Sequence, residues 1–406
     1  MDPITHGITG ALLGKGFFSD RQGRVATFAA ALGAVFPDID LIAEFVSRDP
    51  MAIVKYHRGI THSFVALPFF AAALAWLTRL VARRRGIETP SWGMLTIIYG
   101  VGIASHILLD GTTSFGTRMW TPFSQKRVAW DLMFIIDFVL SACVLLPQVV
   151  AWIYNDEARK QSLNSSRATK MWALFSAAAV LVWAVALITG YPFHLWIVGL
   201  VSALLAALFF LPGISGWGFQ IRGASWCQTG VCVTLAYVFL CAVAHHAAMV
   251  RVHSFAKENH IAAVRMGALP VPPSLLDWGD AIRTPDGVYQ ARFDLRDAEP
   301  PAFYFVADSL PDAFVARALQ LPEVQLYCQF ARFPTIHTSI VASAKDHIVD
   351  FSEHRFANGN RRAPQPFSYR VIFDDAGNVV AEGWLQNGMF MQSMRRMQTS
   401  PARGAP

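Results

Sequence analysis

Histidine and aspartate side chains gather in four short motifs within the first 110 residues of the chain. The motifs are Asp2-Pro3-Ile4-Thr5-His6, Phe36-Pro37-Asp38-Ile39-Asp40, His57-Arg58-Gly59-Ile60-Thr61-His62 and His106-Ile107-Leu108-Leu109-Asp110. Imidazole and carboxylate are the groups that bind divalent metals such as zinc or manganese. The sequence around them is almost entirely apolar, and ionisable groups are functional candidates in such segments because burying charge in a membrane is costly.

The pair His106 and Asp110 lies in an apolar, helical stretch. A separation of four residues places both side chains on one face of a helix, one turn apart, where they can hold a single ion. The alternative is a histidine and an acid that hydrogen-bond to each other inside a bundle. That alternative is favoured for an isolated pair, but three further motifs accompany this one.

The other three motifs each have a metal-binding and a plainer interpretation. Carboxylates two residues apart, as in Asp38 and Asp40, can bind one metal, bridge two, or divide into ligand and general base, or they can be solvated acids that end a helix. The histidine-rich motif has Gly59 for a turn and Thr61 to cap the next helix, and its histidines could simply face water. Together the motifs predict a metal site made of His6, Asp38, Asp40, His57, His62, His106 and Asp110.

Such a site would hydrolyse its substrate with an activated water. A bound divalent ion lowers the pKa of water from 15.7 to about 7 and polarises the bond under attack. Either Asp38 or Asp40 would accept the proton. Arg58 would hold a phosphate or carboxylate, or form a salt bridge to Asp38, Asp40 or Asp110. Asp131 and Asp137 are expected to hydrogen-bond to a ligand histidine.

The composition is that of a membrane protein. The chain is 54% hydrophobic and 15% charged, against roughly a quarter charged in soluble domains. Six apolar runs approach the ~20 residues that span a bilayer, and two earlier, small-residue-rich runs are counted as spans as well. The predicted segments are 5–18, 24–42, 61–82, 92–110, 132–153, 171–190, 194–212 and 228–249.

Basic residues predict the orientation of these eight segments, because positively charged loops stay in the cytoplasm. The loops on one side carry Lys15, Arg21, Arg24, Arg79, Arg83 to Arg85, Arg159, Lys160, Arg167 and Lys170. The four metal-site motifs then meet on the opposite, extracytoplasmic face. The cations Arg48, Lys55, Arg58, Arg118, Lys126 and Arg127 are exceptions on that outer side.

Several other functions and features are not indicated. The N-terminus lacks a basic region before its apolar run, so no cleavable signal peptide is expected. The five cysteines form neither a CxxC metal motif nor a disulfide framework. A net charge of +6 is modest for 406 residues and gives no reason to expect nucleic acid as a partner.

A soluble, β-rich domain is predicted after residue 250, where charge density rises. Strands are expected at 303–306, 325–330, 338–342 and 369–373, a short helix within 309–320, and a hairpin turn at 374–378. We expect this domain to lie outside the cytoplasm and to cover or shape the site without supplying ligands. Asp350 and Glu353, near His354, are expected to be solvated. His245, His246 and His253 lack a companion acid and are predicted not to bind metal.

The predicted fold is therefore a membrane-embedded, all-α bundle of about eight segments followed by a small α+β domain. Its predicted parts are a metal-site domain at 1–155, additional transmembrane helices at 156–250, the soluble domain at 251–395 and a disordered tail at 396–406.

The four motifs resemble a known family over roughly residues 1–150. It is the YdjM-like family of LexA-regulated inner-membrane proteins, classed as predicted metal-dependent hydrolases. This resemblance implies a membrane-bound hydrolase whose metal site uses these histidines and aspartates. A weaker similarity links the HxxxD helix to zinc-dependent phospholipase C and single-strand nucleases, whose mature N-terminal tryptophan this chain lacks.

Two classes of function follow. The first is a hydrolase with zinc or manganese at the outer face of the inner membrane, acting on a lipid or lipid-linked ester or phosphodiester. The second is a non-catalytic membrane protein with a structural metal site, or a transporter. Transport would require polar groups within several spans, and the last three predicted spans are nearly free of acids.

Overall fold

The computed structural model describes residues 1–47, 49–188, 194–272, 274–341, 346–356, 365–386 and 389–392. Arg48, the ends of the predicted segments 171–190 and 338–342, and the predicted tail 396–406 lie outside the described residues. The chain divides into two compact units that interleave along the sequence. The first contains residues 1–37, 64–109 and 136–239, and the second contains residues 38–63, 110–135 and 240–406.

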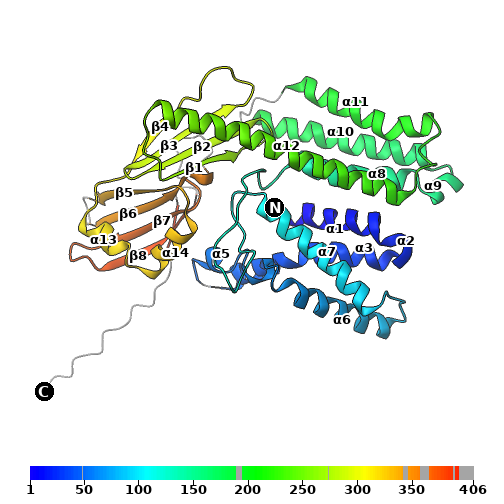
Figure 1. Ribbon diagram of the computed structural model, residues 1–406, viewed down its shortest axis with the longest axis horizontal. Helices are drawn as coiled ribbons and strands as arrows, with labels where there is room; N and C mark the ends of the chain where they lie inside the picture. The colour runs from blue at the N-terminus through cyan, green and yellow to red at the C-terminus, as the bar shows by residue number, and fades with distance from the viewer. Residues whose placement is uncertain are drawn as a thin grey trace. The chain divides into compact units, whose positions relative to one another are not determined.

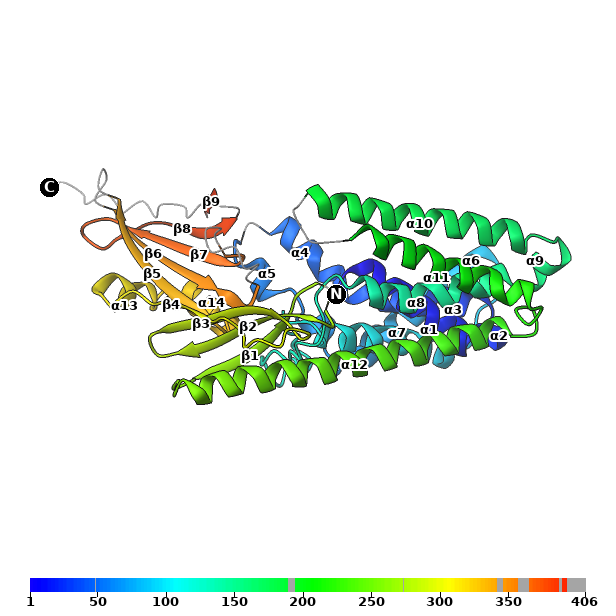
Figure 2. The same ribbon diagram turned by 90° about the horizontal axis from the view of Figure 1, so that it is seen from above.

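The first unit is helical. Asp2 caps its first helix by accepting a hydrogen bond from the Thr5 N–H, and Asp137 caps α8 in the same way through Leu140. Helix α1 packs on α3 and α8 (Figure 1), and α10 lies along α11 (Figure 2). The helices are α1 (Pro3–Phe17), α2 (Ser19–Gln22), α3 (Arg24–Val35), α6 (Leu67–Arg85), α7 (Trp92–Gly111), α8 (Phe138–Ile153), α9 (Asp156–Lys160), α10 (Asn164–Ile188), α11 (Leu195–Ile214) and α12 (Gly223–Glu258). Both α7 and α12 continue into the second unit.

Six helices in the described residues are long and apolar enough to cross a membrane. A seventh span results if the pair Ala52–His62 and Leu67–Arg85, which is bent by 75°, is counted as one. The chain is thus a multi-span membrane protein, but the predicted count of eight is not confirmed. The count of seven leaves out only the predicted segment 5–18, where the 15 residues of α1 extend about 22 Å at 1.5 Å per residue, less than the ~30 Å hydrocarbon core. The count of six also leaves out the predicted segment 61–82.

Glycine allows the first helices to approach one another closely. A Cβ atom at Gly10 of α1 would lie 2.4 Å from the Ala30 carbonyl oxygen of α3, and one at Gly102 of α7 would meet the same oxygen at 2.4 Å. Small residues at such positions let backbones pack in contact, as is common between membrane helices. Asp38 follows the C-terminal end of α3, and His106 and Asp110 lie near the C-terminal end of α7. The close packing of α3 on α7 therefore determines the backbone positions from which these side chains extend.

The second unit combines short loop helices with two antiparallel sheets. Its loop helices are η1 (Phe36–Asp40), α4 (Leu41–Val46), α5 (Ala52–Lys55) and η2 (Ile60–His62). One sheet has the order β1 (Arg265–Pro270), β2 (Asp277–Thr284), β3 (Gly287–Asp294) and β4 (Tyr304–Ala307). The other has the order β5 (Pro334–Val341), β6 (Asp346–Glu353), β7 (Ser368–Phe373), β8 (Val379–Gln386) and β9 (Met389–Gln392). The remaining elements are α13 (Ala313–Ala318), α14 (Pro322–Phe330) and η3 (His354–Phe356).

Each sheet is covered by helix on one face. The end of α12 lies along the sheet of β1 to β3, as Figures 1 and 2 show. Ala248 and Val252 of this helix share a hydrophobic core with Trp278 of β2. The second sheet packs on α13 and α14, with Tyr327 and Tyr369 in its core. That core also includes Met51, Val54 and Phe115, so the loops of the metal-site motifs and this sheet share one hydrophobic core.

Two expectations for the C-terminal domain are wrong. Residues 325–330 form part of helix α14, not a strand, and Pro322 occupies the first turn of that helix, where proline is well tolerated. Glu353 is fully buried rather than solvated, because it accepts hydrogen bonds from the backbone N–H groups of Phe333 and Arg355. The predicted hairpin at 374–378 is confirmed, and it joins β7 to β8.

Substituting glycines of α7 by alanine should separate packing from helix propensity. Gly102→Ala should destabilise the protein by ~1–3 kcal/mol, because the new methyl group collides with the Ala30 carbonyl. Gly93→Ala on the same helix meets no described atom within 4 Å, so it should be neutral or stabilising by up to ~1 kcal/mol. Unfolding in detergent, followed by tryptophan fluorescence, measures both. Equal effects at the two positions would contradict the close approach.

A buried acid in the first sheet should make stability depend on pH. Asp280 shares a face of β2 with Trp278 and Ile282, and burial raises its pKa well above 3.8, while the Arg251 charge offsets only part of this. The folded state therefore keeps a proton that the unfolded state releases above about pH 4. Stability should fall as pH rises from there toward the folded-state pKa.

The test is the variant Asp280→Asn, which cannot ionise. Its stability relative to the unmodified protein should increase between pH 4.5 and pH 7.5, measured by denaturant unfolding at each pH. A difference that does not change with pH would show that Asp280 ionises equally in both states.

Candidate metal centre

Four of the predicted ligand residues come together in one cluster. The ligand atoms of Asp38, His62, His106 and Asp110 all lie within 4.8 Å of one another, and three of the four residues are fully buried. Asp38 comes from η1, His62 from η2, and the other two from α7, one turn apart as predicted. The set of two imidazole nitrogens and two carboxylate oxygens suits zinc or manganese. The residues present therefore fit a divalent metal.

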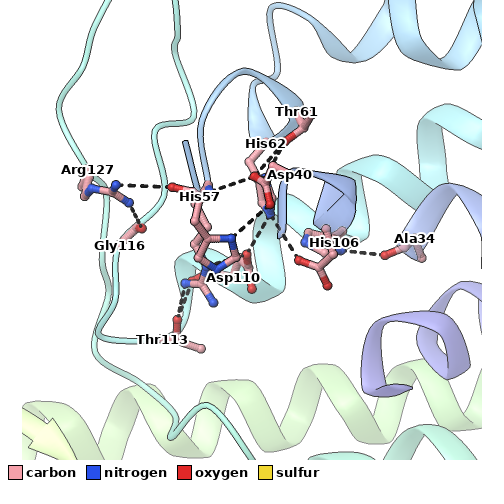
Figure 3. A network of polar contacts seen from close by, with 12 residues as sticks. Ala34, Asp40, His57, Thr61, His62, His106, Asp110, Thr113, Gly116 and Arg127 are labelled. Carbon is pink, nitrogen blue, oxygen red and sulfur yellow. Dashed lines mark hydrogen bonds and ion pairs between the residues drawn. The ribbon is translucent and has the colours of Figure 1, made fainter. Parts of the chain in front are cut away.

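Each histidine of the cluster is oriented through its second ring nitrogen. The Nδ1 atom of His62 lies 3.2 Å from an Asp40 carboxylate oxygen, while its Nε2 atom lies 3.3 Å from Asp110 and 3.7 Å from Asp38. The Nδ1 atom of His106 lies 2.6 Å from the Ala34 carbonyl oxygen. Donation from Nδ1 leaves the Nε2 lone pair directed to the cluster, which is the arrangement of a metal-binding histidine and its outer partner. Figure 3 labels the residues of both Nδ1 contacts, which are His62 with Asp40 and His106 with Ala34.

Asp40 organises the motif that contains His57 and His62. Its carboxylate accepts hydrogen bonds from the Arg58 N–H at 2.9 Å and the Thr61 hydroxyl at 3.0 Å, and it lies 3.1 Å from Nδ1 of His57 (Figure 3). The adjacent acids thus have different surroundings. Asp38 belongs to the ligand cluster, whereas Asp40 supports the histidines.

Arg58 forms the salt bridge that was one of its two predicted roles. Its side chain is 1% exposed, with Nε 2.8 Å from an Asp110 carboxylate oxygen and Nη1 bonded to the Asp110 carbonyl and the Thr113 hydroxyl. A buried ion pair with these added hydrogen bonds fixes the end of α7 against the His57 loop.

The other predicted site residues lie around the cluster. His6 is buried in α1, and its ring stacks on His106 with centroids 3.5 Å apart. His57 pairs with Asp40 and contacts the edge of His62, with centroids 5.9 Å apart. Asp131 forms a bidentate pair with Arg332, and Asp137 accepts a hydrogen bond from Tyr237. These contacts replace the bond to a ligand histidine that was expected of both acids.

Two arginines that the motifs did not single out hold the loops together. Arg127 donates to the carbonyls of Gly116, Val54 and His57, and Arg118 donates to that of Lys55. Burial, followed by the like charge of Arg118, lowers the pKa of Arg127 to about 9, so it stays protonated at neutral pH. In the sequence, these two arginines stand out only because they lie on the predicted outer side, where few basic residues are expected.

Removing the Asp110 charge should strongly destabilise the folded protein. Asp110→Asn leaves Arg58 buried without its counter-charge, which costs ~3–5 kcal/mol. The double variant Asp110→Asn with Arg58→Met should recover part of that loss. The matched control is Asp49→Asn, which breaks the partly exposed pair with Lys55 and should cost at most ~1 kcal/mol. Denaturant unfolding measures all three, and a cost at Asp110 no larger than at Asp49 would contradict the burial argument.

Comparison with known proteins finds a family that the N-terminal part of the chain is similar to. Residues 1–193 match the model of the YdjM inner membrane protein family. The chain is also 26% identical over 145 residues to YfhP of Bacillus subtilis (strain 168), which is named only as an uncharacterized protein. That alignment covers 34% of this chain and 42% of YfhP, less than half of each. No solved structure matches. The match to the YdjM family covers every residue of the metal cluster and confirms the resemblance seen in the motifs.

Proposed function

We propose that this protein is a membrane-bound, metal-dependent hydrolase. The proposal is supported by a buried cluster in which Asp38, His62, His106 and Asp110 come together. The Nδ1 atom of each histidine in the cluster contacts an oxygen atom outside it, which orients the ring. These four residues would hold one divalent ion, zinc or manganese. The chemistry that such an ion supplies is activation of water at neutral pH and stabilisation of negative charge on the substrate.

The surrounding residues would serve positioning and proton transfer. Asp40 and the Thr61 hydroxyl lie 3.2 and 3.0 Å from Nδ1 of His62 and would keep its proton there, so that Nε2 is available to the ion. His57, whose side chain is 14% exposed and pairs with Asp40, is the candidate to carry a proton between the site and solvent. Arg58 is committed to Asp110 and would act on the substrate only indirectly, by fixing that ligand.

We infer the substrate class from location. The cluster lies at the ends of membrane helices, so a lipid or a lipid-linked ester or phosphodiester is the substrate that reaches it most directly. The distribution of basic loops favours the extracytoplasmic face of the inner membrane for the site. The segment 110–135 and the C-terminal domain belong to one compact unit. The C-terminal domain would therefore also lie on the extracytoplasmic face.

A structural metal site is the second candidate. Four buried protein donors complete a tetrahedral zinc site, whereas a catalytic zinc usually has three and keeps one position for water. A six-coordinate ion such as manganese would leave positions open with the same four donors. Metal identity therefore bears on function.

The test is metal analysis and hydrolysis by the protein purified in detergent. We expect about one zinc or manganese per chain, with loss of metal in His62→Ala and Asp110→Ala. Asp40→Asn should bind metal ~10–100-fold more weakly, because it weakens the outer contacts of His57 and His62 without removing a residue of the cluster. His246→Ala, at a histidine without a companion acid, is the control and should keep its metal.

Hydrolysis is then measured on phospholipid vesicles, a p-nitrophenyl ester and bis-p-nitrophenyl phosphate, with and without a chelator. Chelator-sensitive turnover of any of these by the unmodified protein, lost in His62→Ala, supports the hydrolase. Bound metal without turnover favours the structural site. Absence of metal from the unmodified protein would exclude both.

A further inference from the structure

An arginine of the C-terminal domain contacts the loop that follows α7. Arg355 lies in η3, just after β6, and its side chain is 1% exposed. One Nη atom donates to the carbonyls of Ser114 and Phe115 at 3.0 and 3.3 Å, and the other donates to that of Phe330 at 3.0 Å. The guanidinium therefore connects the 112–119 loop to the end of α14.

Glu353 is the ion-pair partner of this guanidinium. Its buried carboxylate accepts the backbone N–H groups of Phe333 at 3.2 Å and Arg355 at 2.9 Å, and it lies 3.7 Å from Nε of Arg355. A buried carboxylate with several backbone donors has little freedom to move. The position of the Arg355 side chain is therefore defined by its three carbonyl hydrogen bonds together with this ion pair.

The residue that Arg355 holds lies beside the metal centre. The Phe115 ring is 5.3 Å from the His57 ring, and the Arg58 guanidinium lies over its face at 5.1 Å. Phe330 also packs on Phe115, with ring centroids 5.2 Å apart. Phe115 thus contacts both the residue that pairs with Asp40 and the residue that pairs with Asp110.

We propose that Arg355 is a positioning residue of the metal centre, acting through Ser114 and Phe115 on His57 and Arg58. The C-terminal domain would then be part of the site, although the match to the YdjM family ends at residue 193. The importance of this contact for metal chemistry rests on the proposed function. The contact itself can be tested without metal.

The first measurement is hydrogen exchange in the metal-free, full-length protein. Arg355→Met should raise exchange in residues 54–63 and 112–119 by at least about tenfold, the factor expected from losing one charged hydrogen bond. Arg355→Lys, which keeps a donor and the charge, should give a smaller increase. The control Arg370→Met removes an arginine of the same domain, whose bidentate pair with Asp350 joins β6 and β7, and it should leave both segments unchanged. Unchanged exchange in Arg355→Met would overturn the proposal.

A second variant covers the case in which Arg355→Met unfolds the domain, detected as exchange in β6 and β7. Phe115→Leu keeps Arg355 and its hydrogen bonds to the Ser114 and Phe115 carbonyls, but it removes the ring that contacts His57 and Arg58. It should raise exchange in 54–63 alone, and unchanged exchange there would equally overturn the proposal.

The second measurement is cobalt binding, read from the visible spectrum of the bound ion. In Arg355→Met and Phe115→Leu, affinity should fall roughly 10-fold, the lower end of what loss of an outer partner costs. Arg370→Met should bind as the unmodified protein does. If the unmodified protein binds no cobalt, zinc or manganese, the proposed function fails, while the exchange result still decides whether Arg355 positions the loops.

Discussion

The site depends on one constraint, which is that a charge taken out of water needs a partner. Asp110 and Arg58 satisfy it for each other, with side chains 1% exposed and 2.8 Å between the charged atoms. The two residues belong to motifs 52 positions apart, so their pair defines how the His57 loop meets the end of α7. Asp40 then orders that loop internally, and His62 is directed toward Asp38 and Asp110 as a result. The cost of burying these charges also explains why the plain salt bridge, and not substrate binding, is the role that Arg58 shows.

The sequence was sufficient to predict that these motifs come together, but not which of their residues form the cluster and which surround it. His106 and Asp110 could be placed together because helical periodicity alone relates them. Asp38 and Asp40 are equivalent in sequence, and only the turn of η1 sends one to the cluster and the other to His57 and Thr61. The same holds for His57 and His62, since the conformation of the loop decides which ring is buried. Local pattern thus fixes which residues take part, whereas long-range packing decides what each one contacts.

In the C-terminal domain, strands with clear turns were predictable and ambiguous segments were not. The strand at 369–373 and its hairpin were found because alternation and the turn residues agree. The segment 325–330 is short and rich in residues that also suit strands, and such a run cannot be assigned by periodicity alone. Tyr327 and Phe330 are core residues of a helix instead. Glu353 was misplaced for a different reason, because its burial follows from backbone donors that a sequence pattern does not display.

The arginines of the loops show how folding and membrane insertion place opposite demands on the same residues. Arg58, Arg118 and Arg127 count against the proposed orientation, because basic residues near membrane helices favour the cytoplasmic side. That bias acts while the chain inserts, before the loops have folded, so later pairing does not remove it. Once folded, these side chains donate to Asp110 and to the carbonyls of Val54, Lys55 and His57, which are structural roles that lysine could not fill with the same multiple hydrogen bonds. Their presence is therefore explained by the architecture of the site, and the orientation rests on the basic residues of the other loops.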